Sequence, residues 1–314
     1  MTVPHRRLAW RESARLLLAV LVGVLVVTGA RAAAPAQKLF ATPDDAVSAL
    51  VQAVKAGDRS GMLAALGNVG EWLSSGDPKA DQAAAARFLS DYEQKHTIVR
   101  DGGKATLTIG NEDFPFAFPL VQRGEQWRFD TASGKEDLLA RRIGGNELSS
   151  IRVLQAIVDA EQEYASEDRT GDGVPAYAQR IVSRPGKRDG LYWPAKADEP
   201  QSPLGVLAAQ AAEQGYKHHE QAPAPYHGYL YRMLKGQGKN ADSGAFDYVV
   251  RGRGIAGFAV VAYPAKYGNS GIMTFIVNQD GKIYQADLGP ETKAKAEGMQ
   301  RFDPGKGWSA VDAR

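Results

Sequence analysis

The sequence predicts an exported α+β protein with two domains joined by a helix. Three observations lead to this class. The N-terminus combines a basic and an apolar stretch, the first half changes from helical to alternating periodicity, and the second half repeats that change. About 280 of the 314 residues remain after an N-terminal leader, which also suggests two domains on size alone.

Residues 1–33 are predicted to be a secretory signal peptide. Basic residues precede an apolar stretch from Leu16 to Val27, and alanines follow around Ala30 to Ala34. The apolar stretch is too short for a comfortable bilayer span, which favours a cleaved signal over the alternative of an uncleaved membrane anchor. We therefore expect a periplasmic or secreted protein with no membrane span after signal cleavage.

The composition excludes several classes of protein. The chain has no cysteine, so thiol nucleophiles, disulfides, cysteine-ligated metals and lipid-modified cysteines are excluded. The formal charge of +2 includes five arginines and one glutamate in residues 1–31, a net +4, which leaves −2 for the remainder. A nearly neutral chain has no electrostatic surface for nucleic acid, so no nucleic-acid partner is expected.

Residues 38–143 are predicted to form the first domain. Thr42 and Pro43 followed by two aspartates predict a helix start, with a hydroxyl cap and acids near the positive end of the helix dipole. Apolar residues then recur at helical spacing, a shorter helix follows Gly57, and KADQAAAARFLSDYEQKH predicts a third helix. Short alternating segments separated by glycine-rich turns predict antiparallel strands after it.

Residues 146–314 are predicted to form the second domain. Gly144-Gly145 is expected to interrupt the linking helical pattern, with Asn146 capping a second helix. A loop rich in glycine, proline and aromatic residues follows, and then three segments predict strands: GYLYRMLKGQ, GFAVVAYPA and GIMTFIVNQDGKIYQADL. Asp280-Gly281 predicts a tight type I′ turn inside the last of these.

The string Gly268-Asn269-Ser270-Gly271 raises the question of a hydrolase nucleophile. The sequence lacks both the Gly-Asp-Ser-Gly string of trypsin-type proteases and a Gly-x-Ser-x-Gly elbow. The string connects two predicted strands, so we interpret Ser270 as a turn residue.

Several long strings resemble one family of exported bacterial proteins, domain of unknown function 2950. They are LSSGDPKAD, PGKRDGLYWP, SPLG, PYHGYLYRML, AFDYVVRGR and GFAVVAYPAKYGNSGIMTFIVNQDGKIYQADLG. The resemblance extends from about residue 38 to the end, within the size of two ordinary domains. Membership implies export and no established activity.

Two further resemblances concern the fold. The order helix, helix, curled sheet in residues 38–133 resembles nuclear-transport-factor-2-like cones, which implies a pocket, and in enzymatic members an acid and a histidine inside it. His96, the histidine in this half, is expected at a surface or junction. The order helix, irregular loop, antiparallel sheet in the second half resembles the globular part of type IV pilins, which implies a pilin-like module.

Two groups of polar residues were weighed as metal sites. Asp168, Thr170 and Asp172 match the first half of an EF-hand loop, but Ala176 and Gln179 stand where later ligands belong. The histidines at 218, 219 and 227 lack acids at ligand spacing. No metal and no cofactor is predicted, and the acidic residues on the second helix, Asp159, Glu161 and Glu163, are expected to be solvated.

Aromatic residues in two loops are the candidate ligand site. Aromatic faces and a few fixed polar groups are typical of ligand-binding clefts. The alternative is that the rings form a small core that orders the long loop. The candidate residues are Asp189, Tyr192, Trp193, Tyr226 and His227.

No catalytic residues are predicted, and the function expected from the sequence is that of an exported non-enzymatic binding or envelope-associated protein. Its partner would be an envelope protein or a small ligand. Two alternatives stay open: a small-molecule hydrolase or isomerase that uses the cone pocket, and a structural partner of an envelope or secretion assembly. A buried acid with a polar partner facing one cavity in residues 38–133 would favour the first, and an unpaired edge strand or apolar patch the second.

Overall fold

The computed structural model describes residues 36–196, 198–214, 216 and 224–311. The predicted signal peptide and the histidines at 218 and 219 lie outside these residues. Within them, no helix is both long enough and apolar enough to cross a bilayer. The observed class is α+β, as predicted, with helices beside antiparallel sheets.

The first half begins with helices whose starts the sequence explains. Thr42 caps the first of them, because its hydroxyl accepts from the Asp45 amide at 3.1 Å while the Asp45 carboxylate accepts from the Thr42 amide. The predicted helices are therefore confirmed. They are α1 (Pro43–Lys55), α2 (Arg59–Leu66), the 3₁₀ turn η1 (Gly70–Leu73) and α3 (Pro78–Gln94).

An antiparallel sheet follows these helices, in the order β1-β2-β4-β5 with β3 paired to β2. Alternate residues of the second strand, Ala105, Leu107 and Ile109, are buried and pack with α1 in one hydrophobic cluster. The predicted alternation is confirmed. The strands are β1 (His96–Asp101), β2 (Lys104–Ile109), β3 (Phe114–Pro115), β4 (Leu120–Arg123) and β5 (Gln126–Phe129).

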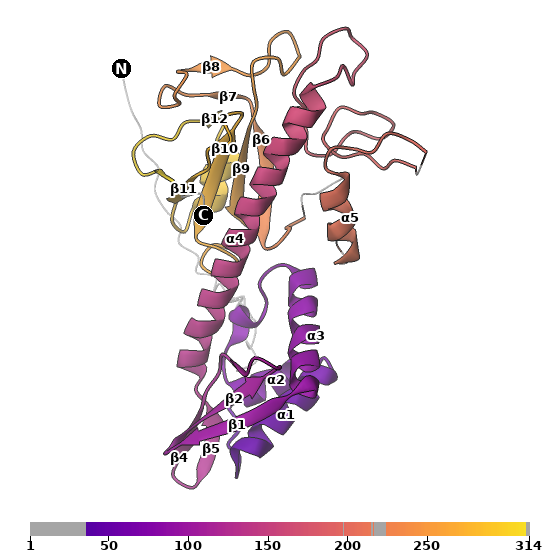
Figure 1. Cartoon of the computed structure of the whole chain (residues 1–314). Coiled ribbons are helices and arrows are strands. Elements are labelled where there is room, and N and C mark those ends of the chain that lie inside the picture. The colour runs from indigo at the N-terminus through magenta and orange to yellow at the C-terminus, as the bar shows by residue number, and fades with distance from the viewer. Residues whose placement is uncertain (1–35, 197, 215, 217–223, 312–314) are drawn as a thin grey trace, which may run out of the picture. The chain divides into compact units, whose positions relative to one another are not determined.

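A single helix, α4 (Thr131–Ala165), leads from this sheet to the second half (Figure 1). It is unbroken through Gly144-Gly145, so the predicted interruption is wrong. Side chains next to the two glycines are held from outside the helix: Arg142 bonds Trp72 and Asn269, Asn146 bonds Ser270, and the Glu147 carboxylate accepts two backbone amides. These bonds offset the poor helix propensity of glycine.

The second half contains a five-stranded antiparallel sheet in the order β13-β11-β10-β9-β6. A smaller sheet joins β12, β7 and β8. The three predicted strand segments correspond to β6 with β7, β9, and β10 with β11. The elements are α5 (Gly205–Glu213), β6 (Tyr229–Leu234), β7 (Gly236–Gln237), β8 (Phe246–Asp247), β9 (Ala259–Pro264), β10 (Met273–Asn278), β11 (Tyr284–Asp287), α6 (Thr292–Gly298), β12 (Arg301–Phe302) and β13 (Ser309–Ala310).

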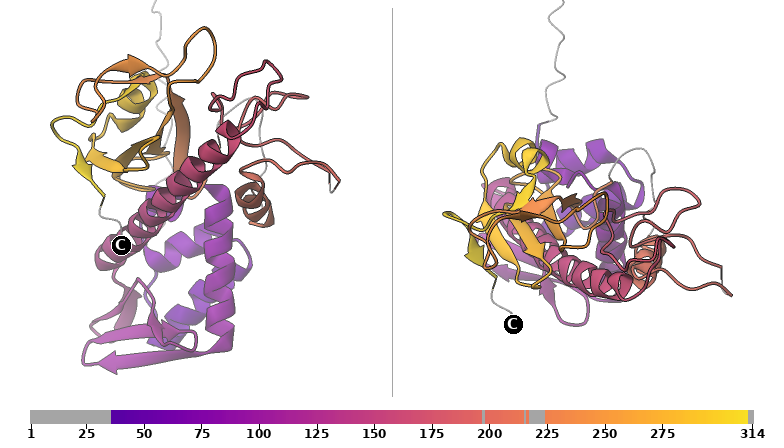
Figure 2. Two further views of the ribbon diagram at one scale, coloured as in Figure 1. Left: turned by 45° about the horizontal axis from the view of Figure 1, so that its top comes forward. Right: turned by 90° about the horizontal axis from the view of Figure 1, so that it is seen from above.

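Both faces of this larger sheet are covered. α4 lies along one face, where Leu154 and Ile157 pack with Val260 and Phe275 (Figures 1 and 2). The other face packs against α6 and the small sheet in a separate cluster. This explains why β9 is apolar at every position instead of alternating.

One turn differs from its prediction. Gly281 has a φ of 72°, but Asp280 is not among the residues with positive φ, and the Gly281 amide donates to the Asn278 carbonyl at 2.9 Å. A type I′ turn needs positive φ at both central residues, so the connection is a three-residue loop that ends in a left-handed glycine.

The two halves have separate hydrophobic clusters, yet contacts group the described residues into one unit. Separate folding of residues 38–143 and 146–314 therefore stays a prediction.

Candidate ligand pocket at the end of α4

A cavity of about 260 Å³ lies where α4 ends and the long loop begins. Its walls come from the last turn of α4, from the loop between residues 169 and 189, and from a turn at residues 252–254. The wall is rich in charged side chains and also has apolar surface. It comprises Tyr164, Arg169, Thr170, Asp172, Val174, Ala176, Tyr177, Gln179, Arg180, Arg184, Asp189, Gly252, Arg253 and Gly254.

The first wall segment is a turn organised by Asp168. Its carboxylate accepts four backbone amides, from Thr170 to Gly173, at 2.7 to 3.3 Å. These amides hold the pKa of Asp168 below its usual value, with the Gly173 amide contributing most. The loop that resembles half of an EF-hand therefore folds around its own backbone, and the described residues contain no cluster of His, Asp or Glu suited to a metal ion.

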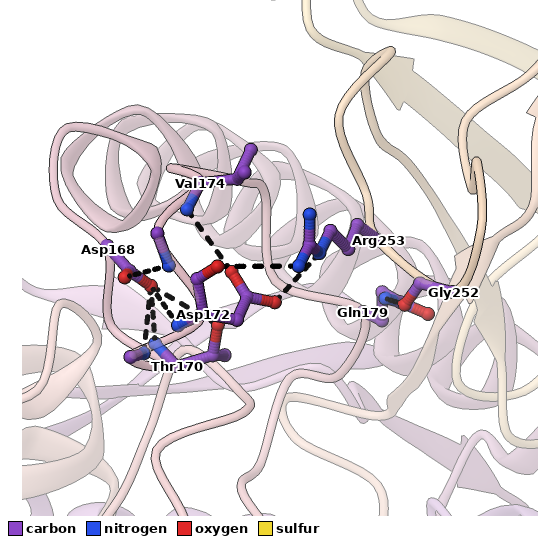
Figure 3. A network of polar contacts seen from close by, with 9 residues as sticks. Asp168, Thr170, Asp172, Val174, Gln179, Gly252 and Arg253 are labelled. Carbon is purple, nitrogen blue, oxygen red and sulfur yellow. Dashed lines mark hydrogen bonds and ion pairs between the residues drawn. The ribbon is translucent and has the colours of Figure 1, made fainter.

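Two contacts fasten this loop to the turn before β9 (Figure 3). The Arg253 guanidinium donates through Nε to the Asp172 carboxylate at 2.8 Å, and the Gln179 amide donates to the Gly252 carbonyl at 2.8 Å. Backbone pairing between Tyr177 and Gly254 adds a third connection. These non-covalent contacts connect two wall segments that lie about 80 residues apart in the sequence. They hold the wall in place without a ligand, which favours binding by pre-organisation.

Asp189 orders the opposite wall. Its carboxylate accepts from the Arg184 amide at 2.9 Å and from the Arg184 Nε at 2.5 Å, and Arg180 lies 3.9 Å away. Burial alone would raise the pKa of Asp189, but the bonds from Arg184 outweigh it and the pKa is lowered. Asp189 is therefore an anion that fixes two arginines of the pocket.

Arg169 is the most buried of the four arginines in the pocket wall. Its side chain is 10% exposed, its nearest carboxylates are Glu167 at 3.5 Å and Glu163 at 3.8 Å, and its buried Nε has no hydrogen-bond partner. The guanidinium lies 5.8 Å from the ring centres of both Tyr164 and Trp193. A buried guanidinium with such distant partners is costly unless another anion compensates it.

The last turns of α4 support the pocket from inside. Glu161 is fully buried, one carboxylate oxygen accepts from the Ala178 amide at 2.8 Å, and the other has no partner. Burial raises the pKa of Glu161 well above its usual value. Burial, with the negative fields of Asp189 and Glu161, also raises the pKa of Tyr164 to about 12, so its phenol stays neutral and donates to the Arg188 carbonyl.

The expectation that Glu161 is solvated is therefore wrong, while Asp159 and Glu163 are exposed as expected. A signal for this was present: Glu161 follows Leu154 by seven residues, Ile157 by four and Val158 by three, which places it on the apolar stripe of α4.

A second polar cluster, which we call the junction, joins the two halves of the chain. Its centre is Asp77, 1% exposed, whose carboxylate accepts from the amides of Lys79 and Ala80, from the Tyr216 hydroxyl at 2.8 Å and from the Gly228 amide at 3.2 Å. The first two bonds cap α3.

The Gly268–Gly271 string forms the other side of the junction. Asn269 is fully buried, donates to the Ser74 carbonyl at 2.8 Å and accepts from Arg142. The Ser270 hydroxyl is also fully buried and bonds within the turn, accepting from the Lys266 amide and donating to its carbonyl. A Cβ on Gly271 would lie 2.1 Å from the Tyr229 hydroxyl. The interpretation of Ser270 as a turn residue is confirmed.

The five candidate ligand residues fall in two places. Asp189 lines the pocket, Trp193 is 4% exposed and packs in the core between Arg169 and Arg188, and Tyr192 is half-buried beside it. Tyr226 and His227 lie at the junction, where both rings contact Tyr216.

Of the residues considered as metal ligands, Thr170 and Asp172 line the pocket. Burial lowers the pKa of His227, although Asp77 opposes this.

Sequence reasoning missed the residues that dominate the pocket, namely Arg169, Arg180, Arg184 and Arg253. Three of them fall in one short stretch, and that local concentration of arginines was the available signal. The fourth comes from a distant turn that periodicity does not connect to them.

Comparison with known families places the chain. The family model described as "Protein of unknown function (DUF2950)" matches residues 37–311, so the chain belongs to this family. The family resemblance derived from the sequence is confirmed. No curated protein and no solved structure matches the chain.

Proposed function

We propose that this protein is an exported, non-enzymatic binding protein, periplasmic or secreted, whose small-molecule site is the pocket at the end of α4. The observation that carries the proposal is the cavity of about 260 Å³, whose wall is held by hydrogen bonds between distant segments and includes a nearly buried arginine, Arg169. Buried charged side chains in proteins are usually paired, so an arginine with only distant ion pairs beside a cavity is available to a ligand.

The alternative of a hydrolase or isomerase in the first half receives less support. The buried acid of that half, Asp77, has four hydrogen bonds and serves as a helix cap. His96 is exposed and stacks on Tyr92 at 3.9 Å. General acid–base chemistry needs a group free to exchange a proton with a substrate, and neither residue offers one.

The alternative of an envelope-assembly partner rests on resemblance. A cone-like first half and a pilin-like second half fit the sequence of elements, and we keep both as part of the proposal. The five-stranded sheet has β6 at one edge, but every open sheet has edges, so this strand does not favour assembly over binding.

The test is a thermal-shift screen of the processed protein against neutral, anionic and cationic small molecules. Ala176→Phe places a ring at the pocket wall, and Ala209→Phe makes the same change on the exposed side of α5. We expect compounds that raise the melting temperature of the parent and of Ala209→Phe but not of Ala176→Phe, because binding to the folded state alone stabilises it. Equal responses of the two variants, or no response to any compound, would contradict the proposal.

A further inference from the structure

The pocket wall carries an excess of positive charge. Four arginines and two aspartates, Asp172 and Asp189, line the pocket, so the lining residues carry two more positive than negative formal charges. Asp172 pairs closely with Arg253 and Asp189 with Arg184, at 2.8 and 2.5 Å. Arg180 reaches Asp189 only at 3.9 Å, and Arg169 has ion pairs at 3.5 and 3.8 Å with carboxylates outside the lining. Of these two, Arg180 is more than half exposed and water stabilises its charge, whereas Arg169 is nine-tenths buried.

Arg169 therefore provides the place for a ligand anion. Its nearest carboxylates, at 3.5 and 3.8 Å, belong to side chains that are more than half exposed. A carboxylate that enters the pocket would pair with a guanidinium that already lies over two aromatic rings and is nearly buried, so it loses little side-chain entropy on binding.

The remaining polar groups suit hydroxyls. Each wall aspartate uses part of its acceptor capacity on an arginine and one backbone amide, and an ionised carboxylate has about four acceptor sites. Thr170 and Gln179 add a hydroxyl and an amide. The same two aspartates repel a second negative charge, which disfavours phosphate dianions relative to a single carboxylate.

The size of the cavity limits the ligand. Pockets for drug-sized molecules have volumes of about 300–1,000 Å³. The cavity here, about 260 Å³, lies just below that range and fits a ligand of a single small ring.

We propose that the pocket takes a monocarboxylate that also carries several hydroxyls, that is, a sugar acid of one ring, with Arg169 binding its carboxylate and Asp172 and Asp189 its hydroxyls. This inference rests on the proposed function and adds the chemical class of the ligand.

The experiment separates the two ligand features. Isothermal titration calorimetry on the processed protein compares D-glucuronate with D-glucose, which lacks the carboxylate, with cyclohexanecarboxylate, which lacks the hydroxyls, and with inorganic phosphate. We expect D-glucuronate to bind at least about tenfold more tightly than each of the others, because a hydrogen bond to a charged group is worth that much or more.

Matched variants assign the carboxylate contact. Arg169→Gln should weaken D-glucuronate binding by roughly 10- to 100-fold while leaving D-glucose binding unchanged. Arg188→Gln removes a positive charge that also lies over Trp193 but does not line the pocket, and should change binding less than about twofold. Arg169→Lys, which keeps the charge but loses the planar fork, should be intermediate. Circular dichroism melts verify that each variant is folded.

Four results would overturn the inference: D-glucose or phosphate binding as tightly as D-glucuronate, cyclohexanecarboxylate doing so, full affinity in Arg169→Gln, or no binding of D-glucuronate. If D-glucuronate fails while other compounds stabilise the parent but not Ala176→Phe, the ligand class is wrong and the binding function stands. If no compound acts at the pocket, both proposals fall.

Discussion

The junction and the pocket are both built from buried polar side chains, yet they differ in how completely these are paired. At the junction, Asp77, Asn269 and Ser270 all have hydrogen-bond partners. In the pocket wall Arg169 keeps a buried Nε without one, and Glu161 and Trp193 in the core behind it each keep such an atom, among seven in the described part of the chain. A fully paired network specifies a structure, whereas each buried atom left unpaired keeps an uncompensated desolvation cost.

The difference in pairing between the junction and the pocket is meaningful only if the region around the pocket is well packed. Trp193 lies beneath Arg169 at 4% exposure, so Trp193→Ala should cost about 3–5 kcal/mol of the free energy of unfolding. Chemical denaturation measures this, with Val206→Ala on the exposed face of α5 (74% exposed) as a control that should stay within about 0.5 kcal/mol. A loss below 1 kcal/mol for Trp193→Ala would mean that the unpaired atoms reflect poor packing.

Tyr226 belongs to the same five candidate ligand residues as Trp193, and Tyr226→Ala allows their contributions to stability to be compared. Its ring is half-buried at the junction, so we expect a smaller loss than for Trp193. Equal losses would assign both rings to the core.

Substitution of Asp77, at the centre of the junction, should destabilise the protein. Asp77→Ala leaves the Tyr216 hydroxyl and the Gly228 amide without an acceptor and removes the cap of α3, which should cost roughly 2–4 kcal/mol. Asp77→Asn keeps one acceptor oxygen and should cost less. The measurement is again denaturant unfolding, and a neutral Asp77→Ala would show that these bonds contribute little.

One substitution next to the pocket, at Glu161, should stabilise the protein, whereas those at Trp193, Tyr226 and Asp77 should destabilise it. The pKa of Glu161 in the folded protein is raised above 4.5, so the folded state holds a proton that the unfolded chain releases. Stability therefore falls as pH rises from about 4.5 to the folded pKa and is flat above it. Glu161→Gln removes this loss and should stabilise the protein at pH 7 by on the order of 1 kcal/mol.

Melting temperatures between pH 4 and pH 8 test this expectation. The exposed neighbour Glu163, changed to Gln, should keep the pH dependence of the parent. A Glu161→Gln variant with the slope of the parent would show that folding does not raise the pKa of Glu161.

Local rules predicted most of the fold. The cap at Thr42, the alternation of β2 and the apolar β9 each follow from residues close in sequence, and each is observed. The pocket was not predictable in this way, because Arg253 reaches Asp172 across 81 residues. The interruption at Gly144-Gly145 was predicted from propensity and fails because tertiary bonds from both flanks decide the outcome.

The unbroken α4 has a consequence for amide hydrogen exchange. Each of its two central glycines weakens a helix by about 1 kcal/mol relative to alanine, so these turns would open first in an isolated helix. Here Arg142, Asn146 and Glu147 fasten the turns on either side to backbone groups of distant segments. Protection of the amides at 144–149 therefore reports the integrity of the junction: slow exchange at the least helical point of α4 arises from the turn at residues 268–271 and from the segment around Trp72, not from the helix itself.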